Sequence, residues 1–126
     1  MNVPTNLKYT NDHEWIKIEG NTGIIGITDY AQSQLGDIVF IDLPADLESI
    51  TFNSTFGTIE AVKTVSDIKA PCTGKVIEIN QKILDEPQVV NSDPYGQGWF
   101  IKVEINDLKE VEELLTPDAY IDLIKE

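Results

Sequence analysis

Positive charge is scarce in this sequence. Nine basic side chains stand against 22 acidic ones, which gives a formal net charge of −13 at pH 7. All nine are lysines, so the planar guanidinium group that favours bidentate contacts with phosphate is missing. This balance argues against nucleic acids and anionic membranes as partners. It favours contact with basic surfaces of partner proteins instead.

Residues that catalyse reactions or bind metals are scarce as well. His13 is the only histidine, so a multi-histidine metal site or a histidine pair for acid–base catalysis cannot be built within one chain. The single cysteine, Cys72, excludes an internal disulfide and fits a reducing compartment, although a secreted protein without disulfides would look the same. Nothing in the pattern places it beside His13 as a nucleophile pair. We therefore expect no catalytic site and no metal site.

Long apolar runs are missing, and the first six residues lack the charged and apolar regions of a signal peptide. We therefore expect a soluble chain without a targeting segment. Its 126 residues, 41% of them hydrophobic, favour a single domain, residues 1–126, with its own core.

Short apolar segments bounded by turn residues predict a mainly β fold. Residues 15–19 and 24–27 should pair as a hairpin across a glycine-containing turn. Residues 37–43 form a nearly continuous apolar run, which predicts a strand covered on both faces. Further strands are expected at residues 50–52, 75–79 and 99–105, for a total of six to eight in a small barrel or sandwich.

Capping residues predict small helices between and after the strands. Thr28 or Asp29 should cap a helix that ends at Gly36, and residues 81–98 should be mostly irregular, with one helical turn. Near the C-terminus, Asp107 and Glu110 form a capping-box pattern.

A second C-terminal helix should start at Thr116-Pro117, because proline suits the first helical position.

Two short apolar strands flank Lys63. Ile59 and Val62 precede it, and Val65 and Ile68 follow it, so the lysine should stand at a hairpin tip. The tight-turn dipeptides Asn-Gly and Asp-Gly are missing, and the hairpin rests on the strand pattern. By itself, an exposed turn lysine is an ordinary surface residue.

This segment resembles the lipoyl-lysine segment of glycine cleavage system H proteins. The likeness rests on Glu60-Ala61-Val62-Lys63-Thr64-Val65-Ser66-Asp67, followed by Ala70-Pro71-Cys72-Thr73-Gly74. It continues in order through His13-Glu14-Trp15, Gly26-Ile27-Thr28-Asp29-Tyr30, Leu35-Gly36-Asp37-Ile38, Val90-Asn91, Asp93-Pro94-Tyr95 and Gly98-Trp99. The chain departs from the commonest motif at Ala61, where serine is frequent, and at Thr64-Val65, where small residues are usual.

The resemblance implies a barrel-sandwich hybrid of the lipoyl/biotinyl type, built of short antiparallel strands with small helices, including C-terminal ones. It also implies lipoate on Lys63 and a carrier role without catalysis. In this family a glycine decarboxylase (P protein) loads an aminomethyl group, an aminomethyltransferase (T protein) removes it, and dihydrolipoyl dehydrogenase (L protein) reoxidises the dithiol. Lipoate-attaching enzymes are further implied partners. Lipoate relay to other proteins stays open, as does the compartment, a bacterial cytoplasm or a processed organellar form.

The resemblance further implies an acidic cleft that receives the loaded arm. Glu14 and Asp67 match the cleft positions, and Asp12 stands where a neutral side chain is familiar. Trp15 is either a wall of this cleft or plain core. Without the resemblance, all three carboxylates would be assigned to the solvated surface.

Three other functions would also use or tolerate an exposed lysine of this kind. A biotin carrier normally has methionines beside its lysine, whereas the neighbours here are Val62 and Thr64. A lipoyl domain of a 2-oxo acid dehydrogenase is usually followed by a flexible linker, whereas this sequence ends in predicted helices. A structural adaptor would take up no lipoate.

Overall fold

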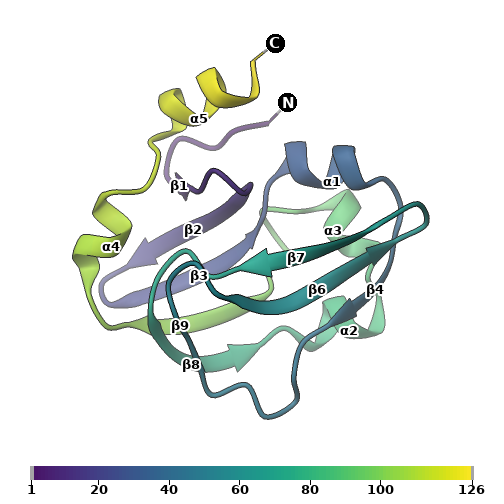
Figure 1. Ribbon diagram of the computed structural model, residues 1–126, viewed down its shortest axis with the longest axis horizontal. Coiled ribbons are helices and arrows are strands. Elements are labelled where there is room, and N and C mark those ends of the chain that lie inside the picture. Colours follow the sequence, from purple (N-terminus) through teal and green to yellow (C-terminus); the bar gives the residue numbers. More distant parts are fainter. Residues whose placement is uncertain (1, 126) are drawn as a thin grey trace.

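Two antiparallel sheets make up the computed structural model, which describes residues 2–125 (Figure 1). The larger sheet has six strands in the order β1-β2-β3-β9-β8-β5, and the smaller has three in the order β4-β6-β7. The strands are β1 (Lys8–Tyr9), β2 (Glu14–Glu19), β3 (Thr22–Ile27), β4 (Ile38–Asp42), β5 (Ser49–Ile50), β6 (Thr55–Ala61), β7 (Val65–Lys69), β8 (Gly74–Ile79) and β9 (Ile101–Ile105). The predicted mainly β fold is confirmed, with nine strands in the described residues rather than six to eight.

One apolar core lies between the two sheets. Ile25 and Ile101 reach it from the larger sheet, and Ile59 and Ile68 reach it from the smaller one. Each of these four side chains is at most 1% exposed, and burial of one isoleucine contributes about 1.5–3 kcal/mol. The strand alternation that places Ile59 and Ile68 inward leaves their sequence neighbours Glu60 and Asp67 facing outward.

The prediction that residues 37–43 are covered on both faces is wrong. Val39 and Phe40 of β4 are each 52% exposed, because a β-bulge between Ile38 and Phe40 turns both side chains outward at the sheet edge. The expected strand at residues 50–52 is also shorter, since β5 ends at Ile50.

The five helices of residues 2–125 are short and cover the ends of the sheets. They are α1 (Asp29–Leu35), α2 (Gln81–Asp85), α3 (Val89–Ser92), α4 (Leu108–Glu112) and α5 (Pro117–Ile124). Thr28, rather than Asp29, caps α1, because its Oγ1 accepts a hydrogen bond from the Ala31 amide at 3.1 Å. Gly36 ends the helix at φ +78°, where glycine is favoured.

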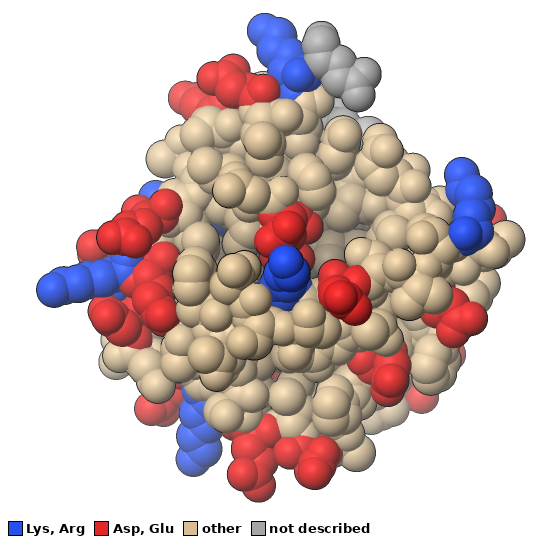
Figure 2. All heavy atoms as spheres, viewed as in Figure 1, with Lys and Arg blue, Asp and Glu red and all other residues tan. Residues whose placement is uncertain are grey.

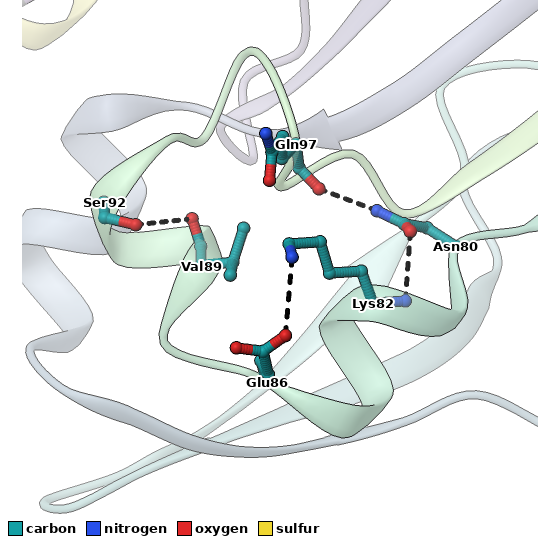
Figure 3. A network of polar contacts seen from close by, with 6 residues as sticks. All are labelled: Asn80, Lys82, Glu86, Val89, Ser92 and Gln97. Atoms are coloured by element: carbon teal, nitrogen blue, oxygen red, sulfur yellow. Dashed lines mark hydrogen bonds and ion pairs between the residues drawn. The ribbon is translucent and has the colours of Figure 1, made fainter.

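The segment predicted to be mostly irregular contains both α2 and α3. Asn80 organises it: its Oδ1 caps α2 by accepting from the Lys82 amide, and its Nδ2 donates to the Gln97 carbonyl (Figure 3). The same Nδ2 also donates to the Trp99 carbonyl. Lys82 and Glu86 pair at 3.4 Å on the exposed side of α2. Asn80 therefore separates the end of β8 from the start of α2.

The predicted capping box before α4 forms only in half. Asp107 accepts from the Lys109 amide at 2.9 Å, but Glu110 turns away and accepts from both the amide and the hydroxyl of Thr73, at 2.8 and 3.1 Å. A tertiary partner thus replaces the local one. The predicted helix at Thr116-Pro117 is α5, whose capping oxygen is Thr116 Oγ1.

No helix of the described residues combines the length and the apolar character needed to span a bilayer.

Candidate functional site

Lys63 stands at the tip of the β6–β7 hairpin, as predicted (Figure 1). The tip is residues 62–64, and it is closed by the Ala61 amide, which donates to the Thr64 carbonyl at 2.8 Å. The Val62 amide donates to the Asp37 carbonyl at 3.0 Å, which ties the tip to the chain just after α1. These backbone contacts explain how a hairpin forms here without an Asn-Gly or Asp-Gly turn.

The Lys63 side chain is exposed and open to modification. Two ion pairs occur in residues 2–125, and both involve other lysines. A Cβ placed on Gly36 would lie 3.4 Å from the Lys63 Cε, so the glycine leaves room for the lysine stem. The neighbours Val62 and Val65 are 71% and 63% exposed. An amide-linked group on Lys63 would therefore meet no obstruction from these neighbours.

Glu14 begins β2 and is buried, with 2% of its surface exposed. Thr10 Oγ1 donates to Glu14 Oε1 at 2.6 Å, and the Lys69 amide donates to Oε2 at 3.4 Å. Burial raises the Glu14 pKa to about 7, because loss of water outweighs the two hydrogen bonds and the nearby Lys69 charge, all of which lower it. The carboxyl group is thus poised to ionise near neutral pH.

Asp12 and Asp67 are both exposed and line one groove of about 350 Å³. Asp67 of β7 is four residues beyond Lys63, which places it within roughly 14 Å even if the chain between them is fully extended. Figure 2 shows how acidic side chains spread over the face viewed, with lysines standing singly among them. The groove therefore offers negative charge within a short distance of the hairpin tip.

Glu14 opens into a second groove, of about 260 Å³, which reaches toward α4 and is also lined by Glu110 and Glu113. The two grooves share Asn11, Asp12 and Lys69. Asp12 lines both grooves, Glu14 lines only the second and Asp67 only the first, so the three predicted cleft carboxylates are brought to one region but not into a single cleft.

Lys69 is the residue that the sequence reasoning missed. Its backbone amide donates to Glu14, and the residue lines both grooves. A signal was present, because alternation along β7 places Asp67 and Lys69 on the same face of the strand.

Trp15 belongs to the core and not to a cleft wall. It is 1% exposed, its ring packs where Gly26 leaves space, and its Nε1 donates to the Pro94 carbonyl at 3.1 Å. Cys72 is buried, and burial raises its pKa to about 12. No hydrogen bond of the described residues joins it to His13, whose Nδ1 contacts Tyr120 instead.

Two small sheets around one core, with a lysine displayed on a hairpin tip, define a barrel-sandwich hybrid of the lipoyl/biotinyl type. The family model "Glycine cleavage H-protein" matches residues 7–126. The chain belongs to the glycine cleavage H-protein family.

Two similar proteins support this membership. The glycine cleavage system H protein of Carboxydothermus hydrogenoformans is 55% identical over 124 residues, which cover 98% of this chain and 95% of that one. The crystal structure of a glycine cleavage system H protein from Mycobacterium marinum superposes with a TM-score of 0.86 at 39% identity, covering 95% of this chain and 97% of that one.

Proposed function

We propose that this chain carries lipoate on Lys63 and serves glycine cleavage as a carrier without catalysis of its own. Family membership supports a lipoyl-carrier role in glycine cleavage. The observation that carries the assignment to Lys63 is its exposure at a hairpin tip closed by backbone hydrogen bonds. Seven of the other eight lysines extend from strands or helices rather than from a turn, and Lys125 follows α5.

The proposed linkage is an amide between Lys63 Nζ and the carboxyl group of lipoate, which removes the positive charge of the lysine. When attached, lipoate would supply a disulfide: as glycine loses carbon dioxide, one sulfur would take the aminomethyl group and the other would become a thiol. The chain's own part is to display the attachment point, to present carboxylates to the cationic amine of the cargo, and to limit the access of water. Asp12, Glu14 and Asp67 are the residues we assign to the amine.

The proposed partners are the glycine decarboxylase, the aminomethyltransferase, dihydrolipoyl dehydrogenase and the enzymes that attach lipoate. Two surface features support contact with proteins: a net charge of −13, and exposed Val62 and Val65 beside the lysine. The two relatives named above are bacterial, which supports the cytoplasm of a bacterium as the setting.

Reconstitution tests the proposed function. The lipoylated protein, mixed with the three enzymes, tetrahydrofolate and NAD, should support glycine-dependent NADH formation, and the unmodified protein should not. A lipoylated protein that forms no NADH in this mixture, yet passes lipoate to other proteins, would contradict the glycine-cleavage role and favour lipoate relay.

Arm loading by the decarboxylase should slow as salt rises from low to physiological strength. The reason is that exposed charges are screened beyond about 8–10 Å under those conditions, and the acidic surface would no longer steer the encounter. The measurement is the second-order rate constant of loading, with free lipoamide as the control acceptor that carries no acidic surface. A rate constant that falls equally for both acceptors, or for neither, would contradict electrostatic steering.

A further inference from the structure

The turn that presents Asp12 and Glu14 is strained at the residue between them. His13 has φ +70°, a left-handed conformation that costs free energy for a residue with a side chain. The hydroxyl of Thr10 contacts the residues on both sides of His13: its Oγ1 accepts from the amides of Asp12 and Glu14, at 3.2 and 3.1 Å, and donates to the Glu14 carboxyl. These three hydrogen bonds require the backbone to turn at His13. The geometry of the acidic site therefore follows the backbone of His13.

Backbone contacts hold His13 on one side. Its amide donates to the Thr10 carbonyl at 3.2 Å, and its carbonyl accepts from the Thr28 amide at 3.0 Å. These bonds tie the turn to the residue that caps α1.

A tyrosine near the C-terminus holds the side chain of His13. Its Nδ1 lies 2.9 Å from the hydroxyl of Tyr120 in α5, and that hydroxyl lies 2.7 Å from Thr28 Oγ1. The single hydroxyl proton of Tyr120 can serve only one of these contacts, and Thr28 or His13 supplies the other proton. Thr28, Tyr120 and His13 thus form one continuous hydrogen-bonded chain.

Tyr120 is itself fixed in place. It is fully buried, its ring stacks on Tyr9 with centroids 4.6 Å apart, and it meets the His13 ring edge-on at 5.7 Å. Tyr30 of α1 also packs against the imidazole, with ring centroids 4.9 Å apart. The C-terminal helix α5, which lies next to β1 (Figure 1), therefore contributes a buried support for His13.

We propose that Tyr120 is a positioning residue, which holds Glu14 in place for the cationic cargo by fixing the strained turn through His13. The inference rests on the proposed function, because it gives the turn a role in retaining the aminomethyl group. It also assigns α5 a part in the site, although the helix lines neither groove.

The test compares Tyr120→Phe with Tyr9→Phe in the full-length protein. The first change removes the contact with His13 and keeps the stacked rings, while the second removes a hydroxyl that donates to the Pro4 carbonyl, away from the turn. His13→Asn breaks the same contact from the other side, and asparagine tolerates the left-handed backbone. It serves as the second variant if Tyr120→Phe does not fold.

The first readout is the ionisation of Glu14 in the unloaded protein, followed by carboxyl carbon NMR. Tyr120→Phe should raise the Glu14 pKa further, because a relaxed turn weakens the Thr10 hydrogen bond that lowers it, and Tyr9→Phe should leave it unchanged. Loss of the cargo from the loaded protein should speed up about three- to ten-fold in Tyr120→Phe alone.

The outcomes separate the positioning role of Tyr120 from the proposed carrier function. If Tyr120→Phe and His13→Asn match Tyr9→Phe in both readouts while Glu14→Ala loses its cargo faster than the parent, the positioning role is overturned and the proposed function stands. If the parent retains its cargo no better than Glu14→Ala, the protective role of the site fails. The Glu14 titration then still decides whether Tyr120 positions the turn.

Discussion

Replacing Lys63 with arginine should abolish lipoylation and every activity that depends on it. Arginine keeps the charge and most of the length, but its guanidinium stays protonated and does not form the amide. The fold should be unaffected, with a change in the free energy of unfolding below about 0.5 kcal/mol, because the side chain is exposed. Intact mass after lipoylation, NADH formation in the reconstituted system and urea denaturation measure the three effects.

Lys75→Arg is the matched control, since Lys75 is also exposed and extends from β8 in the larger sheet. It should accept lipoate at the parent rate. Residual glycine-dependent activity in Lys63→Arg, with lipoate found elsewhere on the chain, would contradict the proposed role of the hairpin tip.

Glu14→Ala should leave lipoylation and loading possible but speed the loss of formaldehyde and ammonia from the isolated loaded protein by about five- to thirty-fold. This range corresponds to a loss of roughly 1–2 kcal/mol from one charge-assisted hydrogen bond to the cargo amine. If both Glu14→Ala and Asp67→Ala lose their cargo at the parent rate, the two carboxylates belong only to the acidic surface.

Glu14→Gln separates charge from shape, because it keeps the volume and one acceptor oxygen. The Glu14 pKa of about 7 adds a pH dependence: below pH 7 the carboxyl group takes up a proton and no longer offers a negative charge. The advantage of the parent over Glu14→Gln in cargo retention should therefore shrink as the pH falls from 8 to 6.

The same pKa makes a prediction for stability. The folded-state pKa of Glu14 is raised from 4.5 to about 7, so between these values the folded state binds more protons than the unfolded state. The contribution of Glu14 is thus fully present below pH 4.5 and is lost as the pH rises through 7. Relative to Glu14→Gln, the parent should lose stability over this range, and the comparison cancels the opposite effect of His13, whose pKa is lowered by burial.

Local patterns in the sequence were enough to predict most of the fold. Apolar alternation predicted the hairpin of β2 and β3, and the caps Thr28 and Thr116 predicted the starts of α1 and α5. The position of Lys63 at a tip followed from the same alternation on either side of it. These features depend on neighbours within a few residues.

Features that depend on distant partners could not be predicted in this way. Glu110 accepts from Thr73 rather than completing its capping box, and the bulge in β4 exposes Phe40. In the site, burial changes Glu14 from a solvated carboxylate into one with a raised pKa. The contact between His13 and Tyr120 joins residues 107 positions apart, a separation that no local pattern encodes.

The most direct test of the central proposal is peptide mapping of the protein after lipoylation. All nine lysines compete in one sample, so the map shows where the attaching enzyme acts on the folded chain. We expect one lipoyl group per chain, on the peptide that holds Val62, Lys63 and Thr64. Lipoate on Lys69 or Lys75 instead, or spread over several lysines, would contradict the assignment of the hairpin tip as the attachment site.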